Sequence, residues 1–415
     1  MVGSLLTKSD FSTTPLPASN LRELGVDRVG DARVLLIEDS SFARKTITAI
    51  LSNYGFDNLR CAADGAEGVR MAIEWSPEVI ITDLFMPVKS GFDVCKDLRR
   101  LPEFHETPII VQTSSDTPAL RGDVFEAGAS DLITKPINAR ELLSRLIVHL
   151  ERIRLIDSLK AYRNQMREEL DAAKAMQMEL LPADNLIAQL EQTYPARFAW
   201  HSQPCQGLAG DIWDVRALDE NSIRLWAADF TGHGVRSALN TFRLNTFVRT
   251  REVNPNQSPE DWLASLNVFL CDVLPLGQFA TLLCCDIDFA AGKVKFASAG
   301  APEPVLRRAG RHELIDISGM PIGISKRAEF GVTVRDMGPG DSIFAYSDAL
   351  TETPSADDPL FTPENLVCSL DALTCDLASK PARLLSRLME VSEKGLDDDL
   401  TLVFVEWQEG AREEV

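Results

Sequence analysis

The 415-residue sequence has no apolar run that reaches the roughly 18 to 20 residues needed to cross a membrane. Its first twenty residues also lack the basic region and long apolar core of a secretion signal. Because both features of an inserted or exported protein are missing, we expect a soluble, cytoplasmic protein without a membrane partner.

Positive charge is scarce, with 42 Lys and Arg residues against 62 Asp and Glu residues and a net charge of −20. No basic stripe offsets this excess, which argues against a nucleic-acid partner. The eight cysteines include no CxxC pair and the five histidines are scattered, so a zinc site is not expected. Any bound metal should therefore be a hard cation held by oxygen atoms.

The hydrophobic pattern divides the chain into segments, and its length suits two or three domains. Residues 1–31 are polar and without period, as in a mobile leader. Short apolar runs alternate with helical patterns over residues 32–137, which predicts a doubly wound α/β domain with a parallel sheet. Residues 138–182 predict one long linker helix. Strand clusters interrupted by helices over residues 183–408 favour a β-sandwich with outer helices, and residues 409–415 are a tail.

The predicted linker helix carries an apolar stripe with spacings mostly of three or four residues, which favours a coiled coil and a homodimer. Repeated spacings of three between Leu150 and Tyr162 break a clean heptad. The alternative is that the stripe packs on the chain's own domains. Its members are Leu142, Leu146, Leu150, Ile153, Ile156, Leu159, Tyr162, Met166, Leu170, Ala173 and Leu180.

Polar side chains follow successive predicted strands of residues 32–137. Glu38 and Asp39 follow "VLLI", Asp83 follows "VIIT", and Thr113 and Lys135 end two further apolar runs. In a parallel sheet these groups share one edge. Three carboxylates there could hold Mg²⁺, and a lysine with a hydroxyl could bind a phosphoryl group on a carboxylate. Any one of them alone is more often an ordinary loop residue.

Four acidic clusters adjoin predicted strands in residues 183–408: "AGDIWD", "ADFTGHG", "AYSDALTE" and "DDDLT". Adjacent carboxylates repel and raise one another's pKa, and burial adds to this effect. Each cluster is therefore either a solvated turn or part of a site that holds a cation. Small or glycine neighbours would allow close approach of a ligand to the backbone.

With the motifs "VLLIED", "VIITD" and "ITKP", residues 32–151 resemble the receiver domain of two-component response regulators. The resemblance implies that Asp83 accepts phosphate from a histidine kinase or phosphotransfer protein. It also implies a Mg²⁺ site and two switch residues. The Mg²⁺ ligands would be Glu38, Asp39, Asp83 and the carbonyl of Phe85, and the switch residues Thr113 and Lys135. Leu132 stands where the family often has an aromatic residue.

Besides the four acidic clusters, residues 170–408 contain the motifs "AKAMQMELLP", "FATLLCCDI", "ASAGAPEPVL", "SGMPIGI" and "GPGDSIFAYSDALTE". In these features the segment resembles the metal-dependent PPM (type-2C-like) Ser/Thr phosphatases of the SpoIIE/RsbU branch. This resemblance implies an α-β-β-α sandwich that binds two Mn²⁺ or Mg²⁺ ions. The implied ligands are Asp211, Asp229, the carbonyl of Phe230, Asp348 and Asp398. Asp214 and Asp399 would support these ligands, and His233 would either protonate the leaving serine oxygen or stabilise its turn.

Three residues depart from this branch: Ala209 and Ala349 replace glycines, and Ala301 replaces a histidine. Two hypotheses follow from the resemblance. The first is a receiver-controlled phosphatase that acts on a STAS-domain anti-anti-sigma factor in a partner-switching stress pathway. The second is a catalytically dead adaptor of the RssB type, which would bind a sigma or anti-sigma factor.

Overall fold

The computed structural model describes residues 31–115, 117–205, 207–232, 234–352, 362–392 and 395–408. Residues 1–30 of the expected leader, the expected tail and His233 lie outside these ranges. The chain forms two compact units, Met1–Gln165 and Met166–Val415. Over the described ranges, no helix combines the length and the apolar character that crossing a membrane requires.

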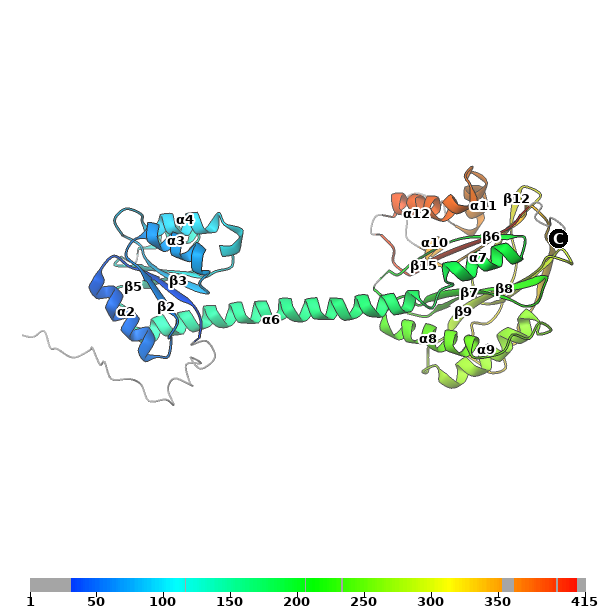
Figure 1. Ribbon diagram of the computed structural model, residues 1–415, viewed down its shortest axis with the longest axis horizontal. Helices are drawn as coiled ribbons and strands as arrows, with labels where there is room; N and C mark the ends of the chain where they lie inside the picture. The colour runs from blue at the N-terminus through cyan, green and yellow to red at the C-terminus, as the bar shows by residue number, and fades with distance from the viewer. Residues whose placement is uncertain are drawn as a thin grey trace, which may run out of the picture. The chain divides into compact units, whose positions relative to one another are not determined.

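The first unit contains a five-stranded parallel sheet with the strand order β2-β1-β3-β4-β5 (Figure 1). Every residue of the three central strands is buried, because helices cover both faces of the sheet. The predicted doubly wound α/β fold is confirmed. The strands are β1 (Val34–Ile37), β2 (Leu59–Ala62), β3 (Val79–Asp83), β4 (Ile109–Thr113) and β5 (Asp131–Thr134).

Two helices cover one face of this sheet and three cover the other. The first face packs against α2 (Ser41–Asn53) and the beginning of α6 (Ala139–Met178), and the second against α3 (Gly65–Trp75), α4 (Gly91–Arg99) and α5 (Pro118–Glu126). Leu142, Leu146 and Leu150 of α6 are fully buried in this core. The first part of the predicted apolar stripe is therefore a face of the receiver fold.

The long helix α6 ends at Met178, short of the expected end at Pro182, and a short helix α7 (Asp184–Thr193) follows it. Beyond Leu150, Ile153 and Ile156 of the stripe are half-buried, whereas its next members Leu159 and Tyr162 are 59% and 62% exposed. Leu155, which lies outside the predicted stripe, is 61% exposed. The helix thus carries a buried apolar face at its start and an exposed one further on.

Two antiparallel sheets of five strands each form the second unit, in the orders β13-β10-β9-β8-β7 and β12-β11-β14-β15-β6. Trp213 of the first sheet and Trp200 of the second pack with ring centroids 5.5 Å apart, so the two sheets face one another. The strands are β6 (Ala196–Gln203), β7 (Asp211–Ala217), β8 (Ser222–Phe230), β9 (Ala280–Asp288), β10 (Lys293–Ala299), β11 (Val305–Arg308), β12 (Arg311–Leu314), β13 (Thr333–Asp336), β14 (Ser342–Tyr346) and β15 (Leu400–Trp407).

Helices cover the outer face of each of these sheets (Figure 1). The sheet that contains β7 and β8 packs against α8 (Val235–Arg249) and α9 (Pro259–Val273), and the sheet that contains β15 packs against α11 (Pro363–Asp371) and α12 (Lys380–Val391). Ser258 caps α9 by accepting a hydrogen bond from the Asp261 amide with its side chain. The α-β-β-α sandwich is confirmed.

Adjacent residues of α12 allow a test of this packing, because Leu388 is 1% exposed and Met389 is 44% exposed. We expect Leu388→Ala to lower the free energy of unfolding of the sandwich by about 2–5 kcal/mol, since it removes buried contacts with the sheet. Met389→Ala should change it by less than about 1 kcal/mol. Urea unfolding, with amide hydrogen exchange of β15 to locate the effect, measures both. Equal losses in the two variants would contradict the packing.

Candidate metal sites

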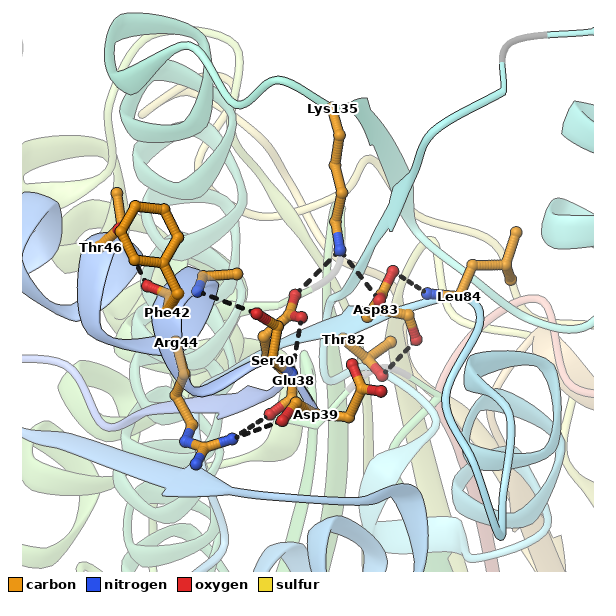
Figure 2. A network of polar contacts seen from close by, with 11 residues as sticks. Glu38, Asp39, Ser40, Phe42, Arg44, Thr46, Thr82, Asp83, Leu84 and Lys135 are labelled. Atoms are coloured by element: carbon orange, nitrogen blue, oxygen red, sulfur yellow. Dashed lines mark hydrogen bonds and ion pairs between the residues drawn. The ribbon is translucent and has the colours of Figure 1, made fainter. Parts of the chain in front are cut away.

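The first acidic site lies at the edge where the neighbouring strands β1 and β3 end. Glu38 and Asp39 follow β1, and Asp83 is the last residue of β3 (Figure 2). One oxygen from each carboxylate lies within 4.8 Å of the others. Over the described part of the chain, no other group of His, Cys, Asp or Glu residues meets this criterion. The set offers only oxygen ligands, which fits Mg²⁺.

Lys135 approaches this group from the end of β5 (Figure 2). Its Nζ lies 3.0 Å from Oε2 of Glu38 and 2.9 Å from Oδ2 of Asp83. Burial alone would lower the pKa of Lys135, but its contacts with the two carboxylates outweigh this effect and raise it. Burial and the nearby Asp83 raise the pKa of Glu38, although Lys135 opposes the rise. The lysine therefore stays charged and neutralises part of the site.

Hydrogen bonds fix the orientation of Asp83, whose side chain is nearly buried. The Leu84 amide donates to Oδ1 at 2.8 Å, while Oδ2 faces Lys135. Thr113 ends the adjacent strand β4, but its hydroxyl bonds the backbone of Ser115. Phe85 is 58% exposed beside the site. The phosphoacceptor predicted from the sequence thus has a fixed carboxylate with a cationic neighbour.

The second acidic site draws on both sheets of the sandwich. Asp211 begins β7 and lies directly opposite Asp229 near the end of β8. Asp348 follows β14, and Asp398 precedes its neighbour β15, so both lie at the same end of that pair of strands. The Gly210 amide, next to Asp211, donates a hydrogen bond to Oδ2 of Asp399, next to Asp398, so the two pairs of strand ends lie together.

Burial and mutual repulsion strongly perturb two of these carboxylates. The pKa of Asp229 is raised to about 7, first by burial and then by the charges of Asp348 and Asp398. Asp211 is 5% exposed, and burial followed by the charge of Asp229 raises its pKa well above the ordinary value. The Thr401 and Ser347 hydroxyls moderate this rise, yet neither gives Asp211 a hydrogen bond of normal geometry.

These features fit a site for divalent cations. Both oxygens of Asp211 are buried and accept no regular hydrogen bond, and such groups are rare in folded proteins unless another ligand satisfies them. Burial and then the charges of Glu352 and Asp398 also raise the pKa of Asp348. The two ions of a two-metal site lie about 3.5–4 Å apart. Their ligands are therefore spread more widely than the carboxylates of Glu38, Asp39 and Asp83 in the first unit.

Asp399 plays a different role from its neighbour Asp398. Its Oδ1 accepts a hydrogen bond from the Cys205 amide at 2.7 Å, and its Oδ2 accepts one from the Gly210 amide at 2.5 Å. It therefore ties the start of β15 to the loop that leads into β7. A Cβ at Gly210 would lie 2.9 Å from the carbonyl oxygen of Phe230, so only glycine allows this approach.

Asp214 does not join the group. It lies three residues after Asp211 on β7 and so points to the opposite face of the strand. Its Oδ2 pairs with Nε of Arg216 at 3.2 Å, and Arg216 also donates to the carbonyl of Val248 in α8. Burial raises the pKa of Asp214, although Arg216 opposes the rise. The position of His233 lies outside the described residues.

One residue of this site was missed by the sequence reasoning. Gln177, near the end of α6, is buried and hydrogen bonded to the backbone of Ala209, next to Gly210 and Asp211. It lies in the segment "AKAMQMELLP", which resembles the SpoIIE/RsbU branch. An invariant glutamine among related sequences would be the signal that could have found it.

Comparisons with known proteins agree with this architecture. Residues 34–147 match the family described as response regulator receiver domain, and residues 219–408 match the family described as Stage II sporulation protein E (SpoIIE). The chain therefore joins a response regulator receiver domain to a SpoIIE-type domain. That second domain is a metal-dependent Ser/Thr phosphatase domain of the PPM type.

Individual proteins are similar to parts of the chain. The SiaA-PP2C domain of Pseudomonas aeruginosa is 18% identical, with a TM-score of 0.53 over 60% of this chain and 99% of that one. The chemotaxis protein CheY4 of Vibrio cholerae is 33% identical, with a TM-score of 0.27 over 28% of this chain and 95% of that one. Hybrid signal transduction histidine kinase D of Dictyostelium discoideum is 30% identical over 148 residues, which are 36% of this chain and only 9% of that relative's length.

The geometry of the first site leads to a prediction for Asp83. With Mg²⁺ and a small phosphodonor such as acetyl phosphate, we expect one phosphoryl group per chain, and none in Asp83→Asn, because an amide cannot form the acyl phosphate. Asp123→Asn, an exposed aspartate on α5, is the control and should be labelled as the wild type is. Intact-mass spectrometry counts the groups. Unchanged labelling of Asp83→Asn would rule out the assignment.

Proposed function

We propose that phosphorylation of Asp83 controls the output of a two-metal Ser/Thr protein phosphatase within the same chain. The observation that carries the proposal is geometric: Asp211 lies directly opposite Asp229 in one sheet, and the hydrogen bond from the Gly210 amide to Asp399 brings this pair next to the strand ends of the other sheet. Such a cluster is unfavourable unless cations neutralise it. The match of residues 219–408 to the SpoIIE family supports the same chemistry.

The first site would receive its phosphoryl group from a phosphohistidine of a kinase or phosphotransfer protein. A carboxylate oxygen of Asp83 forms a bond to phosphorus while the phosphorus–nitrogen bond of the donor breaks, and the donor imidazole leaves and takes up a proton. Lys135, already 2.9 Å from Asp83, would pair with the new phosphoryl oxygens. Glu38 and Asp39 would hold the Mg²⁺ that neutralises the incoming charge.

At the second site, Asp211, Asp229, Asp348, Asp398 and the Phe230 carbonyl would hold two Mn²⁺ or Mg²⁺ ions. When bound, these ions lower the pKa of a bound water, which makes it a nucleophile at neutral pH. The carboxylates fix the ions, while the two packed sheets exclude bulk water from Asp211. The substrate would be a phosphorylated serine or threonine of a STAS-domain anti-anti-sigma factor in a partner-switching stress pathway.

The second candidate function is an adaptor without turnover that binds a sigma factor or its regulator. The specific observation in its favour is the set of departures at Ala209, Ala301 and Ala349, of which Ala209 and Ala349 lie within two of the acidic clusters. Ala209 and Ala349 are both buried close to the site. The four carboxylates are nevertheless retained, which favours the enzyme, because an adaptor has no need of mutually repelling buried charges.

The phosphatase proposal is tested with Mn²⁺ and a generic phosphate ester. Asp229→Ala and Asp348→Ala should each cut kcat by about two orders of magnitude or more, since each removes a ligand shared by the ions. The control is Asp336→Ala, which should leave the rate unchanged. Asp336 is an exposed residue of the edge strand β13 and pairs with Lys293. A wild-type chain that is inactive with Mn²⁺ and Mg²⁺, yet binds a sigma-pathway partner tightly, would favour the adaptor.

We further propose that the exposed part of α6 pairs with a second copy of the chain. Leu155, Leu159, Tyr162, Met166 and Leu170 follow at spacings of 4, 3, 4 and 4 residues, and all are at least 37% exposed. Residues at this spacing form one stripe along a helix, which would stay in water unless it were paired. Since Leu150 is buried in the receiver core, a dimer seam would begin beyond it.

A charged residue within this stripe should prevent pairing. We expect Leu159→Asp to convert a dimer into a monomer in sedimentation experiments and to make the phosphatase rate indifferent to the phosphorylation of Asp83. The control Ser158→Asp adds the same charge one position earlier, outside the stripe, and should stay dimeric. A monomeric wild type would exclude this route of control.

A further inference from the structure

A cavity of about 130 Å³ lies in the phosphatase domain between the outer face of one sheet and the helices α8 and α9. Its walls include Arg216 of β7, Arg224 and Trp226 of β8, Phe247 of α8 and Trp262 of α9. Trp226 lies three residues before Asp229 on the same strand and packs against Trp262, so its side chain points away from the face that carries Asp229. The cavity is therefore separate from the candidate metal site.

Two arginines on the sheet side of the cavity, Arg216 and Arg224, stand directly opposite one another on neighbouring strands. Like charges in such a cross-strand pair repel. Each arginine is partly neutralised by one carboxylate. Nε of Arg216 lies 3.2 Å from Oδ2 of Asp214, and Arg216 also donates from Nη1 to a backbone carbonyl. Arg224 donates from Nε and Nη2 to Asp286 at 2.6 and 2.7 Å, and its Nη2 also reaches a backbone carbonyl. Within the described ranges, these contacts leave Nη2 of Arg216 and Nη1 of Arg224 without a hydrogen bond.

Trp226 supplies a third donor that is not used. It is 1% exposed, and its indole Nε1 is buried without an acceptor in the part of the chain that the structure describes. A buried N–H group without a partner is unfavourable, and folded proteins rarely keep one unless water or a ligand accepts from it. Because all three donors belong to residues that line the cavity, a ligand bound there would need acceptor oxygens.

Aromatic rings supply the apolar part of the cavity. The guanidinium carbon of Arg224 lies 5.2 Å from the ring centre of Trp262, and that of Arg251 lies 4.0 Å from the ring centre of Phe247. Flat apolar groups pack well against such rings. The volume is close to that of a cavity of about 150 Å³ that admits benzene, so a single ring fits. Since Asp214 and Asp286 already neutralise the two sheet arginines in part, one negative charge suits the site better than a phosphate dianion.

We propose that this cavity binds a small aromatic carboxylate. Its oxygens would accept hydrogen bonds from the unused donors of Arg216, Arg224 and Trp226, and its ring would pack against the aromatic walls. Arg251, which is exposed and also lines the cavity, would add a positive charge at the rim. The alternative content is water alone. The proposal does not rest on the phosphatase activity, because binding is measured whether or not the metal site turns over substrate.

The probe is 4-fluorobenzoate, whose binding to the full chain is followed by fluorine NMR. We expect saturable binding with a Kd of about 0.1–5 mM, which is ordinary for a ligand of this size. 4-Fluorobenzamide has the same shape without the charge and should bind about tenfold more weakly. Acetate has the charge without the ring and should not displace the probe at equal concentration. Absence of saturable binding, equal affinity for the amide, or displacement by acetate would each overturn the proposal.

Two variants test whether the probe occupies this cavity. Trp226→Phe keeps an aromatic ring but removes the indole donor, so it should weaken binding about tenfold. Arg251→Gln removes an exposed charge at the rim and should weaken binding about two- to fivefold. The matched control is Arg308→Gln, which changes an exposed arginine of β11 in the other sheet and should bind the probe as the wild type does. An unchanged affinity in Trp226→Phe would overturn the proposal. If that variant unfolds, Arg251→Gln decides in the same way.

Discussion

Repulsion between carboxylates held close together is the constraint on which both units depend. In the receiver, Lys135 supplies a fixed positive charge between Glu38 and Asp83, so the site is stable before any ion or phosphoryl group arrives. In the phosphatase domain, the strongly raised pKa values of Asp211 and Asp229 indicate that the protein alone does not neutralise the group. The same repulsion thus underlies both the phosphoryl transfer proposed for one site and the metal binding proposed for the other.

Each fold opposes this repulsion by placing its carboxylates at the ends of buried strands. The strand ends cannot move apart without disturbing a sheet whose residues are almost all covered, as in β1, β3 and β14. Backbone amides add to the restraint where Asp399 accepts from Cys205 and Gly210. The cores therefore hold these charges close together at fixed positions.

Helix α6 shows how one regular element serves several needs along its length. Its first turns complete the receiver core through Leu146 and Leu150, its next turns expose Leu155 and Leu159, and near its end Gln177 is buried against a loop of the phosphatase domain. No single pattern accounts for all three environments. An interpretation of the helix as a coiled coil alone would account for only one of these three environments.

The sequence by itself determined the two domain classes and which carboxylates lie at strand ends, because the signals for both are local. An apolar run followed by an acidic residue marks a strand end such as Asp83 or Asp348, wherever that strand lies in the fold. The sequence also predicted the parallel sheet and the sandwich, since strand and helix periods differ and their order is informative.

Tertiary structure decided what depends on residues far apart in the chain. The alternation of side chains along β7 places Asp211 and Asp214 on opposite faces of the strand. Both carboxylate oxygens of Asp399 accept hydrogen bonds from amides nearly two hundred positions earlier in the chain. Gln177 is buried against a loop 32 residues away. Tertiary structure also assigned Leu150 to the receiver core, although the heptad-like spacing gave no reason to separate it from Leu159. Hydrogen bonds and burial of this kind arise only when distant segments pack, so no local pattern contains them.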